Sequence, residues 1–250
     1  MTPEDFIKSY NQLLDDISAL NPTRLFWATD FASKNRFSSA LPDLLEELAA
    51  TGKTTQKQKE IRLKRMAGVF YHAFKTLLRM VKARRCLKSI RPGVEYTVVK
   101  TFIYNHSFDA QGKYKDVFWG KLPAHLKSSG EVLVYAAILG DYDLCLKKTA
   151  AADFAIVPLE AFLTTGDVLR AVWELFATPV RVPERLDFMG HEVSNVVRDC
   201  LGRVFKGVQL RQFIQFWSTA RLARAVNIKK FYMTYENYPW ERMAIMALRK

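Results

Sequence analysis

The sequence of 250 residues has few cysteines and no pattern among them. Cys86, Cys145 and Cys200 lie far apart, show no CxxC spacing and are odd in number. They predict neither a disulfide framework nor a zinc site, and they suit a reducing compartment. The four histidines also lack the spacing of metal ligands, so we expect no bound metal.

Long apolar runs are absent as well. The longest, Val132–Leu139, is far shorter than the roughly 20 residues that a membrane-spanning helix needs, and it fits a buried strand. The N-terminal stretch MTPEDFIKSYNQLLDD is polar and acidic, whereas a secretory signal would have a basic segment followed by an apolar one. We therefore expect a cytoplasmic protein without a membrane span.

Common nucleotide-binding and hydrolase motifs are missing too. The sequence contains no GxGxxG, HExxH or GxSxG. The GKTT stretch that starts at Gly52 resembles the end of a phosphate-binding P-loop, but that motif needs a glycine at position 47, where Glu47 stands. No tightly bound cofactor is expected.

The chain has the means to build a core, since 49% of its residues are hydrophobic. β-Rich runs predict five strands: Arg24–Thr29, Glu95–Tyr104, Glu131–Leu139, Phe154–Val157 and Lys230–Thr234. Spacing of about 3.6 residues predicts helices: Pro3–Leu20, Ser39–Leu48, 58–88, Thr165–Phe176, His191–Phe205, Gln209–Ala225 and a closing one from Pro239. The alternation predicts an α/β protein with a Rossmann-like, doubly wound, mostly parallel sheet of about five strands and helices on both faces. We expect one domain over residues 1–250.

The formal net charge of +13 is concentrated in one segment. Thirteen Lys and Arg residues lie between Lys53 and Arg91, against the single acid Glu60. Within this segment, residues 58–88 predict a long basic amphipathic helix. Such a helix can bind acidic lipid headgroups, nucleic-acid phosphates or only water. The one-sided charge favours an anionic membrane surface, and nucleic acid is the less favoured partner.

Ligands of doubly wound sheets bind at the carboxyl ends of the strands, so the loops that follow the strands are candidate sites. The first is Ala28–Phe37, which contains Asp30, Ser33, Lys34, Asn35 and Arg36. The cations could hold an anionic substrate and the carboxylate could accept a hydroxyl proton. An ordinary solvated loop explains the same residues equally well.

The second loop, Tyr104–Leu126, combines aromatic residues with His106, Asp109, Tyr114 and Asp116. Rings can cover the apolar faces of a sugar while carboxylates bind its hydroxyls, and an aspartate there could be a nucleophile or base. The alternative is a structured connection with Phe118 and Trp119 in the core.

The third loop follows the last expected strand and contains Glu236 and Asn237, before a helix that starts at Pro239 and carries Trp240 and Glu241. An acid beside a helix N-terminus forms a plausible binding corner. Alternatively, Glu241 favours only the helix N-terminus and Trp240 packs inside.

Taken together, three segments resemble bacterial surface-carbohydrate biosynthesis proteins of the GT-B glycosyltransferase type, related to transferases that use CMP-activated, Kdo-like sugars. The segments are Trp27–Phe37 (WATDFASKNRF), Ser107–Asp109 with Gly112, Tyr114, Asp116, Phe118, Gly120 and Leu122, and Tyr235–Asn237 with Trp240 and Glu241. In that family a second, nucleotide-binding domain follows the third segment, and this sequence does not contain it.

The resemblance implies the acceptor-side half of a sugar transferase for capsule or O-antigen assembly. It implies a CMP-activated donor, a glycan acceptor, a second nucleotide-binding domain or subunit as partner, and a peripheral position at the inner membrane face. On this interpretation Asp30, Asp116 and Glu236 are the catalytic candidates. The substrate-binding candidates are Ser33, Lys34, Asn35, Arg36, His106, Ser107, Tyr114, Asn237, Trp240 and Glu241.

Two other functions stay open. The chain could be a non-catalytic module that binds an anionic membrane or nucleic acid through its basic helix. It could also be a structural partner that completes a separate subunit.

Overall fold

The structure is a computed structural model that describes residues 2–21, 23–29, 40–51, 61–178, 181–202, 207–236 and 238–249. The chain divides into two compact units, and each is described by itself. Unit 1 comprises Met1–Ala73, Arg170–Phe213 and Glu236–Met243, and unit 2 comprises Phe74–Leu169, Ile214–Tyr235 and Ala244–Lys250.

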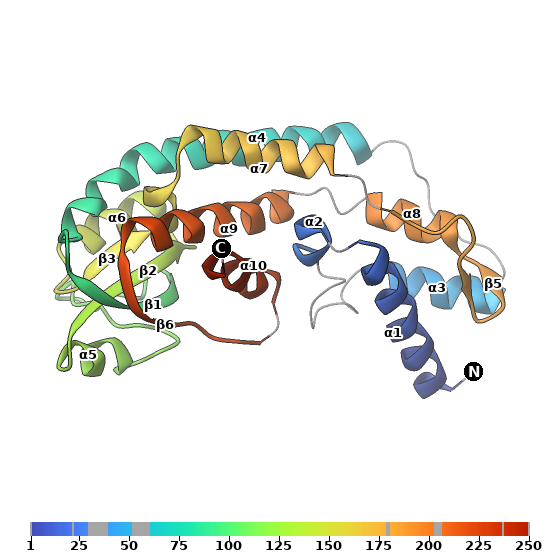
Figure 1. Cartoon of the computed structure of the whole chain (residues 1–250), viewed down its shortest axis with the longest axis horizontal. Helices are drawn as coiled ribbons and strands as arrows, with labels where there is room; N and C mark the ends of the chain where they lie inside the picture. The colour runs from blue at the N-terminus through green and yellow to red at the C-terminus, as the bar shows by residue number, and fades with distance from the viewer. Residues whose placement is uncertain are drawn as a thin grey trace. The chain divides into compact units, whose positions relative to one another are not determined.

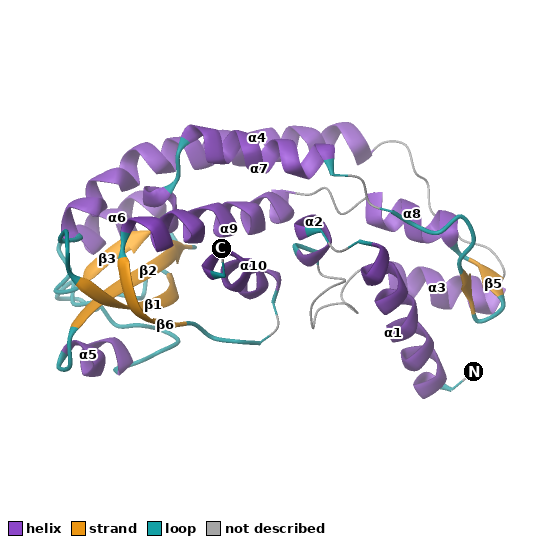
Figure 2. Cartoon of the chain, viewed as in Figure 1, coloured by secondary structure: helices purple, strands orange, loops and turns teal. Residues whose placement is uncertain are grey.

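Unit 2 is built on a four-stranded parallel sheet (Figures 1 and 2). Its strands are β1 (Glu95–Ile103), β2 (Glu131–Ile138), β3 (Ala155–Pro158) and β6 (Asn227–Tyr232). The strand order is β3-β2-β1-β6, with every neighbouring pair parallel. The central strands β1 and β2 are buried along most of their length, as parallel strands covered on both faces should be.

Both faces of this sheet are covered. Lys100 of β1 pairs with Tyr135 of β2, so their side chains share one face. The Tyr135 hydroxyl donates to Ser218 of α9 (Gly207–Ala225) across 2.7 Å, which places α9 on that face. Thr101 therefore points to the opposite face, where it donates to Asp116 in the connection that leads to α5 (Leu122–Lys127).

The predicted α/β class and parallel sheet are confirmed, but the strand count is four rather than five. The first predicted strand, Arg24–Thr29, is wrong: Arg24–Trp27 forms the short helix α2. Phe26 in this helix and Ala28 just after it are buried. A run of six residues is too short for its spacing to separate a buried strand from a buried helical turn.

Unit 1 is mainly helical. Helix α1 (Pro3–Leu20) begins with a capping box, because the side chains and backbone amides of Thr2 and Asp5 bond reciprocally. It shares a core with α2, α3 (Ala40–Thr51), α8 (Ser194–Gly202) and a short hairpin, β4 (Asp187–Phe188) with β5 (His191–Glu192). That core contains Tyr10, Leu13, Leu14, Ile17, Phe26, Leu44, Leu45, Leu186, Phe188, Val193 and Val197.

The predicted helices are found within a few residues, with two exceptions: His191–Glu192, predicted to begin a helix, form β5, and the predicted basic helix divides. Residues Ile61–Ala83 form α4, and Arg84–Ser89 form the 3₁₀ helix η3. The others are α6 (Tyr142–Ala150), η4 (Leu159–Phe162), α7 (Thr165–Ala177) and α10 (Pro239–Leu248). Within the described residues, no helix is both long and apolar enough to span a bilayer.

Candidate functional site

An exposed group of aromatic rings lies where β1 ends. We call Phe102, Tyr104, His106 and Phe118 the aromatic cluster. The rings of Tyr104 and His106 stack with centroids 5.3 Å apart. Phe118 lies 5.5 Å from the Phe102 ring and 6.4 Å from the Tyr104 ring. Phe118 is 50% exposed, so the cluster presents a ring surface to solvent at the carboxyl end of the sheet.

Short hydrogen bonds fix the loop that carries this cluster. The buried Ser107 hydroxyl accepts the Tyr104 amide proton at 3.0 Å, and the Ser107 amide donates to the Tyr104 carbonyl at the same distance. The neighbouring turn after β2 is held to the loop because Asn105 Oδ1 accepts the Asp141 amide proton at 2.7 Å. Gly140 is required there, since an added Cβ would lie 2.8 Å from the Asn105 backbone nitrogen.

Asp116, a predicted catalytic residue, is buried and accepts four hydrogen bonds. The donors are the Thr101 hydroxyl at 3.2 Å, the Tyr114 hydroxyl at 2.6 Å, and the amides of Phe118 and Trp119 at 2.8 Å each. Burial, followed by the charge of Asp116, raises the pKa of the Tyr114 hydroxyl. This geometry favours the structural interpretation, in which Asp116 anchors the loop that presents Phe118.

The third predicted segment contributes a helix cap in unit 1. Glu241 is fully buried, and its Oε2 accepts the amide protons of Glu236 at 2.8 Å and Tyr238 at 2.9 Å. Because Tyr238 precedes α10 and Glu241 is the third helical residue, the second bond is the backbone half of a capping box. Glu236 is exposed and Trp240 is half-buried.

The structure thus brings together His106 and Ser107, near the buried pair of Tyr114 and Asp116. The other predicted residues are not part of this group. Glu236, Trp240 and Glu241 belong to unit 1. Asp30, Ser33, Lys34, Asn35, Arg36 and Asn237 lie outside the described residues.

Lys100 and Glu160 are buried ionisable residues that were not singled out from the sequence. Lys100 is 1% exposed, and its ammonium lies 4.6 Å from the centroid of the Phe102 ring, beneath the aromatic cluster. Burial lowers the pKa of Lys100 to about 7. Burial also raises the pKa of Glu160, although Arg79, whose Nη1 lies 3.6 Å from the carboxylate, acts in the opposite direction. Lys100 could have been identified from the sequence, because it is a charged residue within the apolar run EYTVVKTFIY of a predicted buried strand.

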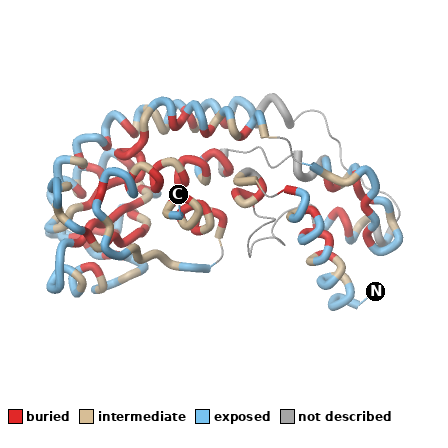
Figure 3. The backbone as a smooth tube through the Cα atoms, in the orientation of Figure 1, coloured by how far each residue is buried: buried red, intermediate tan, exposed pale blue. Residues whose placement is uncertain are grey.

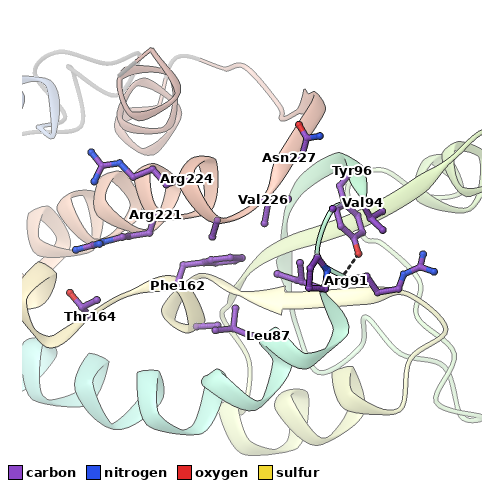
Figure 4. Close-up of a pocket in the computed structure, with 15 residues that line it drawn as sticks. Leu87, Arg91, Val94, Tyr96, Phe162, Thr164, Arg221, Arg224, Val226 and Asn227 are labelled. Carbon is purple, nitrogen blue, oxygen red and sulfur yellow. Dashed lines mark hydrogen bonds between the residues drawn. The ribbon is translucent and has the colours of Figure 1, made fainter.

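A cavity of about 520 Å³ lies at the opposite end of the sheet, beside the amino ends of β1 and β6 (Figure 4). Leu87, Phe162 and Val226 line its centre, and the guanidinium groups of Arg91 and Arg224 extend outward. No carboxylate is among its lining residues. Ligands of doubly wound sheets bind at the carboxyl ends of the strands, where the aromatic cluster lies and this cavity does not, so the cluster is the better candidate.

Among the described residues, no group of three or more His, Cys, Asp or Glu side chains gathers as a metal site. Comparisons with protein-family models, with curated proteins and with solved structures find no match for the chain.

Proposed function

We propose that the chain is a glycan-binding, acceptor-side domain of a nucleotide-sugar-dependent glycosyltransferase of the GT-B type that acts in bacterial surface-polysaccharide assembly. The observation that supports this proposal best is the aromatic cluster at the carboxyl end of β1. A half-exposed phenylalanine beside a stacked Tyr–His pair has the width and polarity to cover the C–H face of a pyranose.

The polar atoms around the cluster fit the same ligand. His106 is exposed and offers a ring nitrogen, and the Tyr104 hydroxyl adds a donor and acceptor. Sugar hydroxyls need such groups at the edges of the ring surface. Asp116 would contribute by holding Phe118 in place rather than by reacting.

The proposal assigns the chemistry to other groups. A CMP-activated sugar is the donor, held by a second domain or subunit, and Asp30 and Glu236 remain the candidates for base or nucleophile. Since nucleotide sugars are made in the cytoplasm, the domain would work there, in peripheral contact with the membrane that carries the growing glycan.

Saturation-transfer NMR on the purified chain tests the proposal, with surface-glycan fragments, CMP and CMP-sugars as probes. We expect saturation of glycan protons and none of CMP alone. Phe118→Ala should weaken glycan binding about tenfold, because it removes the half-exposed phenylalanine ring of the cluster. Trp173→Ala is the matched control, since Trp173 is 71% exposed on α7 in unit 1.

Three outcomes would count against the proposal. Glycan binding that survives Phe118→Ala unchanged would place the site elsewhere. Equal losses in Phe118→Ala and Trp173→Ala would indicate non-specific ring contacts. The absence of saturation transfer to every probe would remove the support for a glycan site.

A further inference from the structure

Helix α4 turns its bulky apolar side chains outward. Its buried side consists of Val69, Ala73, Met80 and Ala83. By contrast, the larger residues Phe74, Leu78 and Val81 are 60%, 50% and 68% exposed. Residues three or four apart lie on one side of a helix, so these three form a continuous apolar strip. Figure 3 shows exposed residues along α4.

This strip is too large to be an ordinary scatter of surface residues. Its three side chains are each at least 50% exposed and follow one another along one side of the helix. Contiguous apolar surface of this kind marks a binding face in soluble proteins. Its occupant has to be identified from the charges around it.

Basic residues lie among and directly after the residues of the strip in the sequence. Between positions 74 and 91 the sequence contains seven Lys and Arg residues and no acid. Lys82 pairs with exposed Asp143 at 2.7 Å. In η3, Arg84, Arg85 and Lys88 are exposed and make no ion pair within the described part of the chain.

We propose that Phe74, Leu78 and Val81, together with Arg84, Arg85 and Lys88, form a docking face for an anionic lipid bilayer. The apolar strip would enter the boundary between headgroups and acyl chains, while the cations bind lipid phosphates. Nucleic acid would use the same cations but would leave the strip in water. An apolar protein partner would leave the three cations without a role.

The proposed function includes a peripheral position at the membrane. The docking face is the surface that would hold the protein there, so this inference rests on the proposed function. Vesicle binding is measured without any sugar. Its failure would therefore leave the glycan proposal standing, and the failure of glycan binding would leave the docking face standing.

Co-sedimentation of the full chain with vesicles tests the docking face. One set contains phosphatidylcholine alone, and the other contains about 30% phosphatidylglycerol to give an anionic surface. We expect binding to the anionic vesicles that weakens with salt, and little binding to the neutral ones. The double variant Phe74→Ser with Leu78→Ser and the triple variant Arg84→Gln, Arg85→Gln, Lys88→Gln should each weaken binding at least about tenfold.

Matched controls come from the connection after β1. Val117→Ser removes a 45% exposed apolar side chain. The triple variant Lys113→Gln, Lys115→Gln, Lys121→Gln removes the same charge from exposed positions. Both controls should bind anionic vesicles within about twofold of the unchanged chain.

Four results would overturn the docking face: no vesicle binding, equal binding to neutral and anionic vesicles, equal losses in the control variants, or unchanged binding in the apolar double variant. A single-stranded oligonucleotide provides the remaining comparison. Tight oligonucleotide binding that depends on the three cations, without vesicle binding, would assign the surface to nucleic acid. Self-association that the apolar double variant abolishes, again without vesicle binding, would assign it to a second copy.

Discussion

Asp116 holds together the connection between β1 and α5 through its four hydrogen bonds. Asp116→Ala would leave buried donors without acceptors, and we expect it to lower the free energy of unfolding by about 3 kcal/mol. Urea denaturation measures this loss. Asp153→Ala, at an exposed position, should change stability by less than about 0.5 kcal/mol. An Asp116→Ala protein of full stability would restore Asp116 as a catalytic candidate.

Lys100 predicts a particular dependence of stability on pH. Burial lowers its folded-state pKa to about 7, below the ordinary lysine value of 10.5. Below pH 7 the residue is charged in both states, and the folded state bears the whole cost of burying the charge. Between about pH 7 and 10.5 the folded state has released a proton that the unfolded state keeps, so the stability contributed by this residue rises with pH.

Lys100→Met removes this dependence. We expect the variant to be more stable than the unchanged chain at pH 6, and the difference to shrink by about 2 kcal/mol by pH 9. Chemical denaturation of both proteins at several pH values measures it. Glu160 titrates in both proteins, so their difference reports mainly Lys100. Parallel stability curves would show that Lys100 keeps an ordinary pKa.

At the scale of elements, Arg221 ties α9 to the start of α7. Its Nε and Nη2 donate to the two oxygens of Asp167 at 2.9 and 3.0 Å. Burial acts to raise the pKa of Asp167, but the hydrogen bonds from Arg221 and Thr164 outweigh it, and the pKa is lowered. The pair therefore contributes stability above the usual aspartate pKa and loses it in acid.

Arg221→Gln should lower the free energy of unfolding by about 1 to 2 kcal/mol at pH 7, a value reduced because the guanidinium is 40% exposed. The loss should shrink as the pH falls below the usual aspartate range. Arg224→Gln is the control on the same helix, and we expect it to be nearly neutral. Thermal unfolding at pH 7 and pH 3 separates the two. A pH-independent loss would indicate packing rather than an ion pair.

The sequence predicted the elements of the sheet better than its surroundings. Four strands were placed within a few residues, because runs such as EVLVYAAIL are long, apolar and β-branched. Arg24–Thr29 was too short for that signal. In α4 the sequence showed which residues are apolar, but not which side of the helix is buried. Ala73 and Phe74 are adjacent and both apolar, yet Ala73 is buried and Phe74 is exposed.

The candidate site was predicted in part. The loop after β1 was identified from its aromatic residues. The alternative, with Phe118 and Trp119 in the core, holds for half-buried Trp119 but not for Phe118, which is 50% exposed. Sequence spacing could not show that Asp116 finds four donors, because one of them, Thr101, lies on β1, 15 residues earlier in the chain. It also could not show that Phe118 faces solvent while Tyr114, four residues earlier, is buried.

At the scale of the molecule, the two central strands should be the most protected part of unit 2. Both have neighbours on either side and pack in the main core with Val98, Val99, Leu133 and Val134. Hydrogen exchange followed by mass spectrometry should therefore be slowest in peptides from β1 and β2. Peptides from the edge strand β6, whose residues are half-buried or exposed, should exchange faster. Equal exchange in all four strands would contradict this order.

The pairing of β1 with β6 has a consequence for synthesis on the ribosome. When β1, β2 and β3 have emerged, one side of β1 still has unpaired backbone groups, and its partner is encoded far downstream. That edge of β1 stays unpaired while the ribosome translates α7, α8 and α9. Translation proceeds at roughly 5 to 20 residues per second. Because β6 has not yet been made, we expect a chaperone to shield the unpaired backbone groups of β1 during those seconds.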